Sequence, residues 1–168
     1  MNKERDLFRG ALLGLAIGDA LGTTVEFSER GTFEPMTDII GGGPFNLKAG
    51  EWTDDTSMAL CLAESLIAQN GMNLSDQLEL YLSWWKMGHN SVTGRCFDIG
   101  YTVKSALESY WSNNESYSGS CHPDTAGNGS IMRLAPVPMF YASNRTQAIL
   151  QAGESSKTTH GAAECVDA

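Results

Sequence analysis

Apolar residues recur at helical spacing through most of this sequence, and that periodicity limits the fold more than any other feature. The spacing predicts helices over residues 54–69, 76–88, 98–111 and 144–154. The first of these has its apolar face formed by Met58, Leu62, Leu66 and Ile67. The alternating pattern of a half-buried strand is almost absent. We therefore expect an all-α protein.

The residues at the ends of these segments predict where each helix starts and stops. Gly71 is suited to the left-handed position that closes the first helix, and Ser75 is suited to cap the second. Asn144 and Gln147 have capping-box spacing before the last one. From His160 onward "THGAAECVDA" has helical character without a stop signal, so we expect the sequence to end in mid-helix.

Glycine recurs every four residues near the start, in "GALLGLAIGDALG". On a helix the four glycines align on one face, which predicts close packing against another backbone. Asp19 interrupts this apolar segment, and a carboxylate in such a place needs a partner. We expect it either to support a metal ligand or to cap a buried helix.

Length and charge exclude several classes of protein. The 168 residues, 42% of them apolar, suit a single domain covering residues 1–168 with a real core. A net charge of −9 without any basic run argues against nucleic acid as a partner. The polar segment 112–130 is long enough to be a functional loop.

The cysteines and the first residues bear on location. The four cysteines are scattered without a C-x-x-C pair, which favours a reducing cytoplasm over a disulfide framework. The start resembles a basic leader followed by an apolar core. Glu4 and Asp6 cancel the basic charge, however, and the apolar run is too short to span a bilayer, so we expect no membrane partner.

An acidic, hydroxyl-rich group precedes the first strong helix, in "GEWTDDTSMAL". Thr53 can cap that helix, and carboxylates in the first turn are favoured by the helix dipole. Asp54 and Asp55 with Thr56 and Ser57 nevertheless exceed what one cap needs. Clustered carboxylate and hydroxyl oxygens also suit Mg²⁺ or Mn²⁺. Capping and metal binding both remain open from these residues alone.

Four blocks in order carry a resemblance to a known family: "GALLGLAIGDALGTTVEF", "GEWTDDTSMAL", "GNGSIMRLAPVPMFY" and "THGAAECVDA". Together they resemble the ADP-ribosylglycohydrolase family, which includes the dinitrogen-reductase-activating glycohydrolases. The resemblance extends over essentially the whole chain. It implies an orthogonal multi-helix fold whose cleft holds two divalent metals, Mg²⁺ or Mn²⁺. The implied reaction is hydrolysis of ADP-ribose from a modified protein side chain or a small ADP-ribose conjugate.

The resemblance also implies roles for particular residues. Thr53, Asp54 and Asp55 match the first metal-ligand block, and Glu26 matches an acidic residue over the metals. Glu26 or Asp55 would act as the base toward water. The implied substrate-binding residues are Asp98, Gly127, Asn128, Gly129, Ser130 and His160. A glycine-rich turn lets backbone N–H groups approach a diphosphate, and Arg133 either adds charge there or is an ordinary surface residue.

One expected block is missing. Family members are longer and carry a second metal block of the type Asp-x-Asp-Thr or Asp-x-Asp-Ser, which this sequence lacks. Three explanations follow: another chain supplies it, the sequence is truncated, or a short form binds ADP-ribose without cleaving it. Helices that would pack on the missing half should leave apolar surface exposed, so we expect association with a complementary chain or self-association. An enzyme, an ADP-ribose-binding module or pseudoenzyme, and a plain helical scaffold are the alternatives.

Overall fold

The computed structural model describes residues 3–168, and within that range it is helical without a β-strand, as the periodicity predicts. The α-helices are α1 (Lys3–Gly22), α2 (Asp54–Gln69), α3 (Leu74–Met87), α4 (Tyr101–Asn113), α5 (Pro136–Phe140), α6 (Arg145–Lys157) and α7 (Ala163–Asp167). Short 3₁₀ helices are η1 (Thr23–Val25), η2 (Pro123–Thr125) and η3 (Asn128–Ser130). No helix of this range is long and apolar enough to cross a bilayer.

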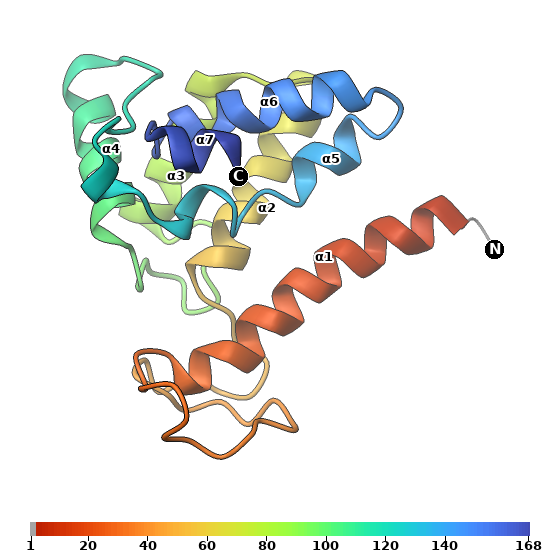
Figure 1. The fold of residues 1–168 in the computed structure, drawn as a ribbon, viewed down its shortest axis with the longest axis vertical. Helices are drawn as coiled ribbons and strands as arrows, with labels where there is room; N and C mark the ends of the chain where they lie inside the picture. The colour runs from red at the N-terminus through yellow and green to blue at the C-terminus, as the bar shows by residue number, and fades with distance from the viewer. Residues whose placement is uncertain (1–2) are drawn as a thin grey trace.

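Helix α2 lies at the centre of the folded body (Figure 1). It packs against α3 on one side and α5 on the other, while α6 contacts α5 and α7. The larger core cluster joins α2, α3 and α4 through fully buried side chains such as Met58, Leu78 and Leu107. A smaller cluster joins α2 to α5 through Leu62, Leu66 and Val137. Both clusters follow from the apolar stripes of the sequence.

Helix α1 stands apart from this body, and Figure 1 shows it running diagonally below the body. The loop of residues 26–53 lies at the C-terminal end of α1, which we call its inner end because Asp19 there contacts the start of α2. Among its described residues only Ala20 is buried. A Cβ added at any of the four stripe glycines, from Gly10 to Gly22, would meet nothing within 4 Å. The expected close contact with another backbone is therefore wrong for this chain. Glycine stripes favour close helix packing only where a second surface is present.

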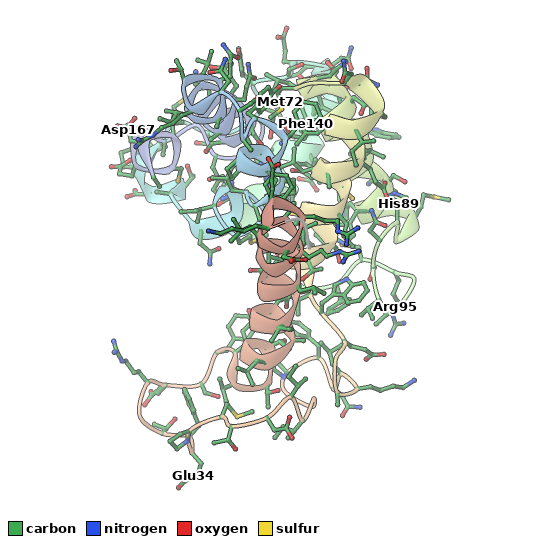
Figure 2. All side chains as sticks on the ribbon, turned by 90° about the vertical axis from the view of Figure 1, so that its right-hand side faces the viewer. Glu34, Met72, His89, Arg95, Phe140 and Asp167 are labelled. Atoms are coloured by element: carbon green, nitrogen blue, oxygen red, sulfur yellow. The ribbon has the colours of Figure 1, made fainter. Side chains whose placement is uncertain are left out.

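The outer half of α1 borders an apolar hollow of about 230 Å³. Phe8 and Leu12 line it from α1, and Leu66, Ile67 and Phe140 line it from the body. Figure 2 shows Phe140 beside this part of the helix. The hollow means that α1 and the body face each other here without filling the space between them.

Several helix ends differ from expectation. Asn70, rather than Gly71, takes the left-handed position that closes α2, with φ 52°. Asparagine tolerates this conformation because its side chain is short and polar. Asn73, rather than Ser75, caps α3 by accepting a hydrogen bond from the Asp76 amide. Asn144 does cap α6, accepting from the Gln147 amide as predicted.

Two helices start later than their patterns suggest. Asp98 has φ 56°, a left-handed conformation that cannot continue into a helix, so α4 begins at Tyr101 after Gly100. His160 forms an isolated bridge with Ser120, and helix α7 begins only at Ala163. Ile67, expected on the inner face of α2, is 75% exposed. It instead faces the hollow beside α1.

Candidate functional site

The start of α2 is held by a carboxylate from another helix. Asp19 of α1 accepts hydrogen bonds from the backbone amides of Thr53 and Thr56 at 3.0 and 3.1 Å. It also accepts from the hydroxyls of the same two residues at 2.8 and 2.6 Å. Thr53 occupies the N-cap position but makes no capping bond through its own side chain. Asp19 therefore caps α2 in place of Thr53, and this corrects the capping expected from the local sequence.

Five acidic residues surround this point and form what we call the acidic cluster: Asp19, Glu26, Asp54, Asp55 and Asp98. Burial, and then the charges of Asp98 and Asp55, raise the pKa of Asp54 to about 9. Burial and the charges of Asp19 and Glu26 raise the pKa of Asp55 to about 6. Without a cation, these carboxylates repel one another and favour protonation.

Glu26 and Asp98 meet at the edge of the cluster. Burial raises the pKa of Asp98, and the charge and side-chain hydrogen bonding of Glu26 add to the rise. Glu26 itself accepts a bond from the Thr23 hydroxyl at 3.4 Å. The structure thus brings together two residues that are 72 positions apart in the sequence.

Three aromatic rings connect these two acidic residues, and the sequence reasoning missed them. Phe27 follows Glu26 and lies 6.3 Å from Phe45, measured between ring centroids. Phe45 lies 5.4 Å from Phe97, the residue before Asp98. The proximity of Phe27 and Phe97 to acidic residues was visible in the sequence. Phe45 gave no signal, because a loop residue carries no periodicity.

A polar hollow of about 270 Å³ opens beside Asp55. It is lined by Gly18, Asp19, Gly22, Thr23, Glu26, Thr53, Asp55 and Asn128. The last two glycines of the α1 stripe therefore form part of its wall. Without side chains they leave the carboxylates accessible, which is a use for glycine other than helix packing.

A second hollow of about 140 Å³ opens beside Asp54. It is lined by Asp54, Gly100, Tyr101, Thr102, Val103, Gly127, Asn128, Gly129, Met132 and His160. Asn128 lines both hollows, so the two lie next to each other across the Asp54–Asp55 pair. The predicted metal-ligand residues and the predicted glycine turn consequently share one region of the surface.

His160 lies under the glycine turn and is only 2% exposed. A Cβ at Gly129 would fall 2.6 Å from the Cε1 atom of His160, so the turn requires glycine there. Burial and the charge of Arg133 lower the pKa of His160 to about 4, which keeps the ring neutral. Its Nδ1 atom lies 2.9 Å from the Thr159 hydroxyl.

Arg133 is fully buried, so it is not the ordinary surface residue that the sequence allowed, and any charge that it adds to the turn comes from beneath the turn. Ser130, at the end of the turn, is also buried. The turn is therefore built on a packed support beneath it. Sequence reasoning missed the burial of Arg133, since arginine is rarely fully buried.

The acidic cluster fits a divalent cation in the type of its donors but not in their number. Carboxylate and hydroxyl oxygens are the ligands that Mg²⁺ and Mn²⁺ prefer, and a cation would remove the repulsion that raises these pKa values. In residues 3–168, however, no three or more His, Cys, Asp or Glu side chains are arranged as a metal-holding group. The described residues offer part of a metal site.

Comparison with known proteins shows the class to which this fold and site belong. The family model described as ADP-ribosylglycohydrolase matches residues 1–168, and the chain belongs to this family of enzymes. It is 48% identical over 162 residues to ADP-ribosylarginine hydrolase Tri1 of Pseudomonas putida (strain GB-1), covering 96% of this chain and 43% of that protein. It is 37% identical over 134 residues to ADP-ribosyl-[dinitrogen reductase] glycohydrolase of Rhodospirillum rubrum, covering 77% and 43%.

The fold agrees with this relationship. A solved structure described as an ADP-ribosylglycohydrolase-related protein complex matches with a TM-score of 0.85 and 42% identity. The match covers 99% of this chain and 53% of the other. The all-α expectation and the family resemblance are both confirmed. The chain spans less than half the length of the curated relatives described above.

Proposed function

We propose that this chain contributes the acidic cluster and glycine turn of a metal-dependent ADP-ribosylglycohydrolase that removes ADP-ribose from modified arginine. The single observation that carries the proposal is the pair of adjacent hollows, one beside Asp55 and one beside the glycine turn, with Asn128 in both walls. The arginine linkage is supported by relatives named ADP-ribosylarginine hydrolase at 48% and 47% identity.

The two hollows suit the two ends of the ligand. The hollow beside Asp55 is rich in polar groups and would take the ribose that carries the scissile bond. Thr53, Asp54 and Asp55 would hold Mg²⁺ or Mn²⁺, which when bound orients ribose hydroxyls and acidifies a water molecule. The hollow lined by Gly127, Asn128, Gly129 and His160 would take the diphosphate, with Ser130 at the end of the same turn and Asp98 two residues before Gly100 of its wall.

Glu26 and Asp55 are the residues proposed to move the proton. Both residues line the polar hollow, so their carboxylates border the space in which the attacking water would lie. Either carboxylate would accept a proton from the water molecule while the water oxygen forms a bond to the anomeric carbon of the ribose. The bond from that carbon to the nitrogen of the protonated guanidinium group breaks, and its electron pair stays with nitrogen. Neutral guanidine leaves and then takes up the proton that the carboxylate accepted from water. The remaining carboxylates stabilise positive charge developing on the ribose.

We also propose that a complementary segment supplies the remaining metal ligands and covers α1. Leu7, Leu13 and Ile17 on that helix are each more than half exposed. Such a row of apolar side chains along one helix is typical of an interaction surface. The complementary segment would belong either to a second chain or to the remainder of a longer chain. The other outcome is self-association of this chain. Sedimentation velocity distinguishes these assemblies by their mass.

The test is calorimetry with ADP-ribose with and without Mg²⁺, followed by a release assay on an arginine-ADP-ribosylated protein. We expect Mg²⁺-dependent ADP-ribose binding by the chain and only slight release in the absence of a complementary segment. Asp55→Ala should abolish both the Mg²⁺ dependence and the release, because it removes a ligand and a base. Glu108→Ala, an exposed acidic substitution on α4, is the matched control and should behave as wild type.

Two results would contradict parts of this proposal. Unchanged release from Asp55→Ala at saturating Mg²⁺ would remove Asp55 from the site. Tight ADP-ribose binding with no release, even after a complementary segment is added, would favour the alternative function of an ADP-ribose-binding module. That alternative also draws on the adjacent hollows, since binding needs the pocket but not the full set of metal ligands.

A further inference from the structure

Arg133 is a buried cation without an acidic partner. Its side chain is 0% exposed, and no ion pair involving it occurs within residues 3–168. Its guanidinium lies 4.7 Å from the centroid of the Tyr81 ring, itself fully buried. The Nε atom has no hydrogen-bond partner among the described residues. Burying a charge in this way is costly unless something nearby compensates it.

The contacts of Arg133 link the glycine turn to the body of the protein. Its Nη1 atom donates to the Gly129 carbonyl at 3.0 Å. Its Nη2 atom donates to the Ser155 carbonyl and the Thr158 hydroxyl, both at 3.2 Å. Ser155 lies in the last turn of α6 and Thr158 is its C-cap residue, and Gln77 of α3 donates to the hydroxyls of the same two residues. The position of Gly129 is therefore set by a polar network deep in the core.

Support for the turn comes from a second side as well. The neutral ring of His160 lies against Gly129, so the backbone there is held by an arginine bond and by a packed ring. The charge of Arg133 is felt by both His160 and Asp54, which line the hollow beside the turn. Arg133 is thus a buried positive charge close to a pocket that has an acidic residue, Asp54, in its wall.

We infer that Arg133 is a positioning residue for the diphosphate of ADP-ribose: it fixes the Gly127–Ser130 turn from beneath and supplies a buried positive charge behind it. The inference rests on the proposed function for the identity of the ligand. A negatively charged ligand in the hollow would compensate the buried guanidinium, which forms no ion pair among residues 3–168 although the charge of Asp54 acts on it. The guanidinium acts through the turn, because the side chain is sealed from solvent.

The experiment compares ligands that differ in charge, using calorimetry with ADP-ribose and with adenosine. Arg133→Met removes the positive charge and the N–H donors of the guanidinium group but keeps an apolar side chain of similar length. We expect at least about a tenfold loss of ADP-ribose affinity, which corresponds to about 1.4 kcal/mol, and less than about a threefold loss for adenosine. Arg133→Lys should recover part of the loss, because it keeps the charge without the fork. Arg145→Met, an exposed change on α6, is the control and should alter neither affinity.

A second variant keeps the inference testable if Arg133→Met does not fold by circular dichroism. Gly129→Ala pushes the turn away from His160 while leaving Arg133 in place, and it too should weaken ADP-ribose more than adenosine. Equal losses for the two ligands in all folded variants would overturn the inference, since a purely structural arginine affects both alike. That result would leave the proposed function standing. Wild-type protein that binds no ADP-ribose would overturn the proposed function and this inference with it.

Discussion

Helices α1 and α2 are both long helices rich in apolar residues, but they differ in what surrounds them. Both are long, largely apolar segments with an acidic residue near the site. In α2 nine residues are buried, including Met58 and Leu62, whereas in α1 only Ala20 is. The difference teaches that an apolar helical stripe predicts a buried face only when the covering surface belongs to the same chain.

The exposed face of α1 is consistent with the extent of the family relationship. The solved relative is matched over 53% of its length, so about half of that structure has no counterpart here. The inner end of α1 is nonetheless attached firmly, through the bonds of Asp19 to Thr53 and Thr56. Helix α1 is therefore attached to the body at its site end, whereas Leu7, Leu13 and Ile17 along the rest of it are exposed.

The largest effect that separates the two helices should come from truncating a core leucine. Leu62→Ala in α2 leaves a cavity beside Leu66 and Val137, and it should lower the free energy of unfolding by about 2–5 kcal/mol. Leu13→Ala in α1 is the matched change and should cost less than about 0.5 kcal/mol, because Leu13 is 59% exposed. Urea unfolding followed by circular dichroism measures both. Similar losses at the two positions would mean that α1 is packed in solution.

A smaller effect is expected where the two helices join. Asp19→Ala removes the acceptor of two backbone amides and two hydroxyls at the start of α2, and should destabilise the protein by about 1–2 kcal/mol. Relief of repulsion within the acidic cluster offsets part of the loss. Asp6→Ala, an exposed acidic change on the same helix, should be almost neutral. Equal effects of the two changes in urea unfolding would contradict the capping role.

A third effect depends on pH and concerns Asp54, the first residue of α2. The folded-state pKa of Asp54, about 9, exceeds its ordinary value of 3.8, so the folded protein holds an extra proton between these limits. Stability contributed by protonated Asp54 is therefore lost as pH rises through this window. Asp54→Asn removes the titration, although Asp55, Asp98, Asp19 and Arg133 still face the position.

In metal-free buffer, Asp54→Asn should raise the melting temperature more at pH 8 than at pH 5. Thermal melts at the two pH values measure this, with Glu108→Gln as the exposed control. Added Mg²⁺ should reduce the difference in melting temperature between Asp54→Asn and wild type, because it stabilises the ionised acidic cluster of the wild type. If this difference in melting temperature is the same at pH 5 and pH 8, the pKa of Asp54 in the folded protein is not raised.

The sequence allowed the helical class and the bounds of α2 to be predicted, because both depend on local spacing. Residues 54–69 were expected and observed as a helix. The late start of α4 was not predictable in the same way, since it depends on the left-handed conformation of Asp98, which the sequence pattern does not encode. Local signals also misplaced the cap of α3 by two residues.

For the site, the sequence indicated which residues to consider but not how they are supported. The cluster of acidic and hydroxyl residues and the family blocks pointed to Asp54, Asp55 and Glu26, and these three residues lie close together in the structure. Arg133 and Phe45 were missed or misjudged, because burial and ring contacts arise from segments far apart in the chain. Long-range packing of this kind leaves no periodic trace in a sequence.

The bonds of Asp19 have a thermodynamic consequence for everything that binds this protein. One carboxylate belongs to the helix with the exposed face and also sits in the wall of the polar hollow. A molecule that docks along α1 and shifts Asp19 changes the free energy of an ion or sugar in that hollow. Linkage then requires the reverse: occupancy of the hollow changes the docking affinity by the same factor. Assembly along α1 and ligand binding in the hollow are in this way thermodynamically coupled.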